Sequence, residues 1–335
     1  MKKLGKLAGL AVGLGLFTLF LSRTNLHELY AALSSADPWL LALGVASGLA
    51  SFFFRALRWR SLLMPLKKTR VNNVVGILMV GYTVSNLLPG RLGDFVVRPY
   101  LIGRTENVSK AAAFATIVVE RIFDMLYVLV LLAAFVTLSP QSLSGPDFKL
   151  VRPVGAALLA LALAAVGMLF VLRTHGDWIQ AWAVRPLALL PARWHERGKA
   201  MVESLVTGMG LFRDTRNAVI SMVHGALTWL LIALTFFFVC RALDLTMVTL
   251  VGTFLLIGLG AVGVAIPVPA GIGSFHFLIA KGLTILGAQD DARIKAAAIL
   301  IHLTSVVPIT AMGLYYWMRM GLSEAQIEAL AEDQA

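Results

Sequence analysis

Two long apolar stretches of this chain are each interrupted by proline and several glycines. The first break is NLLPGRLGDFVVRP over residues 86–99, and the second is AIPVPAGIGSFH over residues 265–276. Proline removes a backbone donor and glycine adds backbone freedom, so neither stretch is expected to form one continuous helix. In hydrocarbon, broken backbone survives only where protein or a wet cavity covers it. One such break in each half of a chain is typical of a transporter's binding site.

The composition indicates a membrane protein. Of 335 residues, 59% are hydrophobic and 14% are charged, and the mean hydropathy is +0.82. Ordinary soluble domains are about 25% charged. We predict an all-α, polytopic integral membrane helical bundle with about six full spans and two oppositely oriented re-entrant helical hairpins. Apolar runs of spanning length lie near residues 4–22, 38–54, 112–138, 152–172, 218–239 and 296–318.

The distribution of Lys and Arg predicts the orientation. Loops 55–70, 98–110 and 173–217, together with the two termini, carry 20 of these residues, against 6 in the opposite loops. The positive-inside rule then makes both termini cytoplasmic. The broken regions 72–97 and 247–288 must each return to the side from which they enter, one from the cytoplasm and one from outside. The alternative is that one region spans fully and that one loop is misassigned.

The predicted organisation is a single membrane domain over residues 1–320 and a short polar cytoplasmic tail over residues 321–335. Segment 173–217 fits an interfacial amphipathic helix with tryptophans at headgroup level. The basic and apolar N-terminus also fits a signal peptide, but no convincing cleavage site follows, which favours an uncleaved helix. We expect the protein in the cell inner (cytoplasmic) membrane.

Several partners and site types are not expected. The formal net charge of +11 does not indicate nucleic acid, because the basic residues lie in loops between apolar runs, where they set orientation and hold anionic headgroups. The single cysteine, Cys240, excludes a disulfide within the chain and a cysteine-based metal site. We predict no metal, no cofactor and, because GxxxxGK[ST] is absent, no ATP hydrolysis.

Charged residues within apolar segments are the candidate site, because an ionisable group in hydrocarbon normally faces a partner or a cavity. The first break and its exit hold Arg91, Asp94 and Arg98, with Asn86 just before the turn. The next apolar run holds a second group, whose members share one helical face or neighbour it. That group is Glu120, Arg121 and Asp124.

These charges have two interpretations, which overlap. One is a buried ion-pair network that clamps the first hairpin to the following helix. The other is that arginines, Arg91 and Arg98 above all, are released to a phosphate when substrate enters, because the planar guanidinium fork matches phosphate oxygens. Asn86 is a further candidate for binding substrate, although capping freed backbone groups is its default use.

In the second break, His276 is a candidate for coupling transport to a proton, since its ordinary pKa is near 6.5, but a histidine that is only hydrogen-bonded is the commoner case. The hinge candidates of both breaks are prolines and glycines. They are Pro89, Gly90, Gly93, Pro267, Pro269, Gly271 and Gly273.

Three segments carry a resemblance to a known family: LPGRLGDFVVRPYLI (residues 88–102), VVERIFDML (118–126) and PVPAGIGSFH (267–276). The chain resembles the lysylphosphatidylglycerol synthase transmembrane region, also called the flippase-like membrane protein family. The resemblance implies handling of phospholipids or polyprenyl-linked lipids, with Arg91, Asp94, Arg98, Glu120, Arg121 and Asp124 as functional residues. Two departures are Asp94 in place of the usual Glu, and Ala270 and His276 in place of a glycine and an acid.

The leading functional hypothesis is a lipid flippase or transporter whose partners are membrane lipids, anionic or polyprenyl-phosphate-linked. A headgroup phosphate would bind Arg91 and Arg98. The alternatives are a membrane-embedded lipid-processing enzyme and a non-transporting accessory protein of envelope assembly. Because the sequence ends at residue 335, we expect only the membrane part of the family, without its aminoacyltransferase domain, and no enzyme activity.

Overall fold

The computed structural model describes residues 2–22, 24–87, 93–139, 160, 164, 215–266 and 268–323 of the chain, which contain helices and no strand. The predicted all-helical membrane fold is confirmed. Within these ranges, four helices are long and apolar enough to cross a bilayer. They are α3 (Pro38–Leu63), α6 (Lys110–Leu138), α10 (Thr215–Ala242) and α13 (Asp291–Arg319). The predicted span near 152–172 and nearly all of the interfacial segment 173–217 lie outside the described residues.

Shorter elements connect and flank these four helices. The N-terminal helix α1 (Lys2–Leu21) covers the first predicted run and leads into a short amphipathic helix. The two broken regions supply the others, including one π-helical turn and one 3₁₀ turn. In chain order these elements are α2 (Leu26–Ser34), α4 (Val71–Leu87), the π-helical turn η1 (Gly93–Val97), α5 (Arg98–Glu106), α11 (Gly252–Ala265), the 3₁₀ turn η5 (Pro269–Gly271) and α12 (Ser274–Ile285).

Capping side chains explain where several helices begin. Asp37 accepts hydrogen bonds from the backbone of Trp39 and Leu40, and proline follows it at the first position of α3. Asp290 caps α13 in the same way. Each carboxylate accepts backbone N–H groups that have no partner within the helix.

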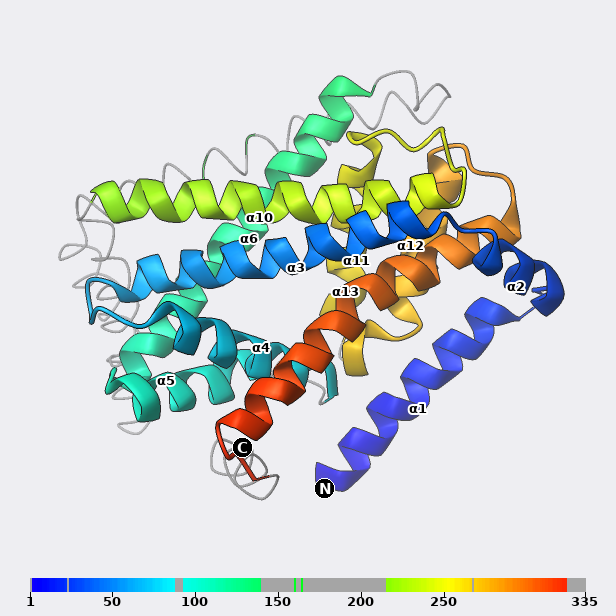
Figure 1. Cartoon of the computed structure of the whole chain (residues 1–335). Helices are drawn as coiled ribbons and strands as arrows, with labels where there is room; N and C mark the ends of the chain where they lie inside the picture. The colour runs from blue at the N-terminus through cyan, green and yellow to red at the C-terminus, as the bar shows by residue number, and fades with distance from the viewer. Residues whose placement is uncertain are drawn as a thin grey trace, which may run out of the picture.

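Helices α3 and α10 form a long antiparallel pair (Figure 1). The backbone N–H of Asp37, before α3, donates to the carbonyl of Ala242 at the end of α10 (2.9 Å). Gly44 of α3 lies against Val239 and Thr235 of α10, so the two helices approach closely. Helix α13 crosses near this pair and packs against both α4 and α12. Both broken regions are therefore held by one spanning helix.

Both predicted breaks are present, and the chain turns back at each. In the first, α4 ends at Leu87, and η1 and α5 return along it. In the second, α11 ends at Ala265 and packs against α12 after the η5 turn. Helix α4 also contacts η5, so the two broken regions adjoin. The hinge candidates Pro89, Gly90 and Pro267 lie outside the described residues. That the two broken regions are re-entrant hairpins in the membrane, and that they enter from opposite sides, stays a prediction.

The other hinge candidates lie at tight backbone positions. In the second break, Gly271 and Gly273 have φ of 71° and 85°, which favours glycine. In the first, a Cβ at Gly93 would overlap the backbone carbonyl of Gly81 in α4, and a Cβ at Gly81 would meet the side chain of Arg98. Glycine therefore allows η1 to pack directly on the backbone of α4.

One loop prediction was wrong. Helix α3 continues to Leu63, so Arg55 and Arg58 belong to that helix, and both are buried. Arg98, counted with loop 98–110, is also buried. Removing these three arginines leaves 17 Lys and Arg against 6, so the predicted orientation keeps its sign.

Gly93→Ala should destabilise the protein, because its methyl group would meet the carbonyl of Gly81. Overpacking of this kind costs about 1–3 kcal/mol. Thermal unfolding in detergent measures the change. Gly15→Ala in α1 is the matched control, since nothing lies within 4 Å of a Cβ there. Equal midpoints for the two variants would contradict the close packing of η1 on α4.

The hairpin orientation is testable with single cysteines at exposed positions beside each break, Leu87→Cys and Ile266→Cys. The native Cys240 is buried and should give little background. A membrane-impermeant thiol reagent should label residue 87 from the cytoplasm and residue 266 from outside. Labelling of both from one side would overturn the opposite orientation.

Candidate functional site

Seven charged side chains from four elements meet inside the helical bundle. We call them the arginine network: Arg55 and Arg58 of α3, Asp94 of η1, Arg98 of α5, and Glu120, Arg121 and Asp124 of α6. Asp124 lies 14 residues from each end of α6, so the network is centred on the middle of a candidate span. At that depth every charge needs a partner.

Glu120 is fully enclosed, and its side chain has no solvent-exposed surface. Arg98 reaches its two carboxylate oxygens through Nη2 (2.8 Å) and Nη1 (3.4 Å), which is the bidentate arrangement. Arg58 approaches from α3 at 3.4 Å, and Arg121 donates to the same carboxylate. One acid therefore binds three arginines from three helices.

Asp124, one helical turn after Glu120, also binds three arginines. Arg55 Nη1 lies 3.0 Å from Oδ2, and Arg58 Nη1 lies 2.8 Å from Oδ1. Arg121 Nη1 is 3.3 Å away, and the indole of Trp229 donates to Oδ1 (3.2 Å). Trp229 brings α10 into contact with the network.

Arg98 is locked by its surroundings. Its guanidinium donates to Asp94 Oδ1 at 2.9 Å as well as to Glu120, and its side chain has no exposed surface. The guanidinium carbon lies 4.1 Å from the ring centre of Trp59, a cation–π contact. Trp59 is fixed in turn by donating to Thr116 Oγ1 (3.0 Å). Arg98 thus ties η1 and α5 to α6, which is the clamp interpretation.

The network has more cations than anions. Four arginines face three carboxylates, an excess of one positive charge among the described residues. In addition, the Nε–H group of each of the four arginines is buried and has no hydrogen-bond acceptor among those residues. A buried donor without an acceptor costs about 1–3 kcal/mol. The arrangement therefore has both charge and donors available to an added anion.

Arg121 stands at the open edge of the network. Its side chain is 17% exposed, more than any other member, against 0% for Arg98. Its Nη2 donates to the hydroxyl of Tyr82 in α4 (3.1 Å), and its Nη1 lies 3.8 Å from Asp94. An anion that approaches from outside the protein meets Arg121 before Arg98.

The structure brings together Asp94, Arg98, Glu120, Arg121 and Asp124, all five of which the sequence singled out. Asn86 is not among them, since its amide donates to Thr310 Oγ1 (3.2 Å) and joins α4 to α13. Arg91 lies outside the described residues.

His276 lies at the turn of the second break, away from these charges. Its Nδ1 accepts the backbone N–H of Gly273 (3.3 Å), which caps the start of α12. Its ring lies 4.6 Å from that of His302, whose Nε2 is 2.9 Å from the carbonyl of Ala270. Ala270 has φ of 50°, a position that a non-glycine residue rarely adopts. The two histidines therefore hold the shape of the turn.

Residues 6–313 match the protein family described as the lysylphosphatidylglycerol synthase TM region, which takes in both breaks and the whole arginine network. The chain belongs to the lysylphosphatidylglycerol synthase transmembrane-region family. It is similar to the protein named glycosyltransferase AglD of Haloferax volcanii, with 26% identity over 87% of this chain and 50% of that protein. It is also similar to a UPF0104 membrane protein of Methanothermobacter thermautotrophicus, with 25% identity over 85% of this chain and 87% of that protein. The chain thus spans about half the length of AglD.

Two residues of the arginine network, Arg55 and Arg58, were not predicted from the sequence of this family member. Both belong to RALRWR, which follows an apolar run and looks like the start of a basic loop. Their spacing of three places them on one helical face, and Trp59 extends the apolar pattern beyond them. Continuing the helix through that pattern would have placed both arginines inside the bundle.

Glu120→Gln should strongly destabilise this family member, because three arginines lose one negative partner inside the bundle. Breaking a buried ion pair from one side costs about 3–5 kcal/mol. Thermal unfolding in detergent measures the loss, and Glu28→Gln at an exposed position of α2 is the control. An unfolding midpoint equal to that of the control would exclude a clamp role for Glu120.

Proposed function

We propose that this protein moves a phospholipid or polyprenyl-linked lipid across the membrane and recognises the phosphate of its headgroup at the arginine network. The observation that carries the proposal is the cation excess of the network at the middle of α6, with an open edge at Arg121. Membership of a family named after lysylphosphatidylglycerol synthase supports a lipid as the ligand.

The arginines take different roles in this proposal. The sequence assigned the phosphate to Arg91 and Arg98. The enclosure of Arg98 between Asp94, Glu120 and Trp59 favours a positioning role for it instead. Arg121 is the first phosphate contact, because it is the most exposed member and its partners are shared with other arginines. Arg91, three residues before Asp94 in sequence, remains a second candidate.

Binding proceeds as an exchange of partners. A phosphate that enters beside Tyr82 accepts hydrogen bonds from the Arg121 fork, as arginine geometry favours. Asp124 loses little when Arg121 turns away, because Arg55 and Arg58 still hold it at 3.0 and 2.8 Å. The acyl or polyprenyl chains remain in the bilayer throughout, so only the headgroup needs a polar path.

A membrane-embedded lipid-processing enzyme is the second candidate, favoured by the relative named as a glycosyltransferase. The similarity covers only half of that protein, so the match does not by itself assign the sugar-transfer activity in its name to this chain. Release of a modified lipid by the purified protein in neutral detergent would favour this candidate over transport.

We also propose that the protein lies in the cell inner membrane with both termini in the cytoplasm. The charge asymmetry of 17 against 6 supports that orientation. The lipid partner is then collected from, or delivered to, the cytoplasmic leaflet, where anionic lipids attract basic segments.

Transport is testable with purified protein in liposomes that contain a labelled anionic phospholipid. The wild-type protein should move the label between leaflets. Arg121→Ala should slow this movement about tenfold or more, because hydrogen bonds to a charged group contribute about 1.5–3 kcal/mol. Arg121→Lys should restore only part of the rate, since the planar fork is lost.

The control is Arg293→Ala, which removes a partly exposed arginine paired with Asp244 and Asp290, away from the arginine network. Unfolding midpoints measured on the same samples separate loss of transport from loss of fold. Unchanged leaflet asymmetry with a panel of anionic and polyprenyl-linked lipids would overturn the flippase proposal. Full activity of a folded Arg121→Ala protein would overturn the role of Arg121.

A further inference from the structure

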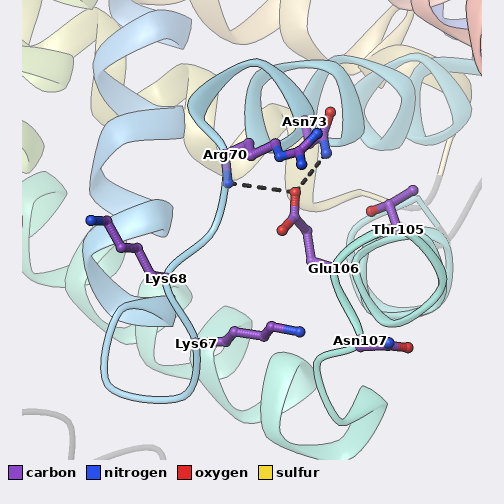
Figure 2. A pocket seen from close by; sticks show the side chains of 7 residues that line it. All are labelled: Lys67, Lys68, Arg70, Asn73, Thr105, Glu106 and Asn107. Carbon is purple, nitrogen blue, oxygen red and sulfur yellow. Dashed lines mark hydrogen bonds between the residues drawn. The ribbon is translucent and has the colours of Figure 1, made fainter.

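A second basic site lies where α3, α4 and α5 reach one end of the bundle. It is a cleft of about 390 Å³ between the loop that joins α3 to α4 and the C-terminal end of α5. Lys67, Lys68 and Arg70 line it from the loop side, and Thr105, Glu106 and Asn107 line it from the α5 side. Figure 2 shows Lys67 extending from the loop into the space in front of the end of α5.

The loop that carries these cations is ordered by its own hydrogen bonds. The backbone N–H groups of Leu66 and Lys67 both donate to the carbonyl of Leu63 (2.9 Å each). Arg60 Nε donates to the carbonyl of Thr69 (2.9 Å), and Thr69 is buried. The lysines thus project from a fixed backbone, which lowers the entropic cost of ordering this loop when a ligand binds.

The cleft has uncompensated positive charge. Glu106 is its only acid, and its carboxylate accepts hydrogen bonds from Asn73 Nδ2 (2.5 Å) and from the backbone N–H of Arg70 (3.5 Å). Within the described part of the chain, Lys67, Lys68 and the guanidinium of Arg70 form no ion pair. Three cations line the cleft against one acid, and Lys67 extends toward the end of α5 while Lys68 points away from it (Figure 2). The cleft therefore has net positive charge and is complementary to an anion.

The position of the cleft connects it to the arginine network. Helix α5 begins with Arg98 in the network and ends with Glu106 in the cleft. Glu106 follows Arg98 by eight positions, so at 1.5 Å per residue their backbones lie about 12 Å apart along the helix. The cleft also adjoins the end of the spanning helix α3, which is where a lipid headgroup lies when its chains are in the bilayer.

We propose that this cleft is a surface binding site for the phosphate of an anionic lipid headgroup, separate from the arginine network. The proposal extends the proposed function by supplying the site at which the lipid is first held, although binding at the cleft does not require transport. Lys67 and Arg70 face the phosphate from the loop, and Asn73 is a neutral donor beside them.

The test is a titration of the purified protein in neutral detergent with fluorescent phosphatidylglycerol, followed by anisotropy. The double variant Lys67→Gln/Lys68→Gln should bind the lipid more weakly, by about fivefold for each lysine near the headgroup. The double variant Lys281→Gln/Arg241→Gln removes the same charge from α12 and α10 and should bind like the wild type. A loss shared equally by both variants would show general charge attraction and overturn the site.

Two further arms separate this proposal from others. Inorganic phosphate at millimolar concentration should not displace the lipid. If inorganic phosphate displaced the lipid with an affinity equal to that of the lipid itself, the cleft would be a site for free phosphate instead. In an Arg121→Ala background, removal of Lys67 and Lys68 should weaken binding by the same factor as in the wild type. If removing Lys67 and Lys68 no longer weakened lipid binding in that background, all lipid binding would belong to the arginine network and the cleft site would be overturned. If the protein failed to transport lipid but still bound it at the cleft, only the proposed function would be overturned.

Discussion

The structure depends on one constraint, which is that charge at the middle of a membrane helix must be paired within the protein. A single charged side chain at that depth costs about 2.5–3.5 kcal/mol even on the most favourable scale. This chain places seven such groups around α6. Every carboxylate is shared by two or three arginines from different elements, so α3, α5, η1 and α6 cannot separate without exposing charge to hydrocarbon. The same ion pairs that stabilise the bundle thereby fix the first broken region, because Asp94 and Arg98 lie on its returning arm.

The sequence was sufficient to predict the helical membrane fold, four of the spans and the place of each break, because these follow from apolar run length and from proline and glycine. It also identified five members of the network, since charges inside apolar runs are conspicuous. It missed Arg55 and Arg58 because charge alone does not show whether a basic segment follows a helix or continues it. Burial of both arginines is a tertiary property. It arises from the acids of α6, which lie more than 60 residues away in sequence.

The two breaks are built from different chemistry, although each returns along its own first arm. The first is held by ion pairs and by the contact of Gly93 with Gly81. The second is held by neutral groups: the His276 cap on Gly273, the contact of His302 with Ala270, and the hydroxyl of Ser274 donating to the carbonyl of Gly263 (2.7 Å). Protonation of His276 at Nδ1 would remove its acceptor and free the Gly273 N–H. The role of His276 in coupling transport to a proton stays a prediction, and this hydrogen bond is the contact that protonation would change.

The arginine network and the surface cleft differ in how strongly water and salt screen them. Charges at the surface are screened over about 8 Å at physiological ionic strength, whereas buried pairs are screened much less. A phosphate at Lys67 and Arg70 keeps part of its hydration and is held weakly, and a phosphate at Arg121 loses more water but meets cations already fixed by their carboxylates. Raising the salt concentration should therefore weaken binding at the cleft more than binding at the network. In the proposed function, the cleft would govern how often a headgroup is captured, and the network would govern which headgroup proceeds into the bundle.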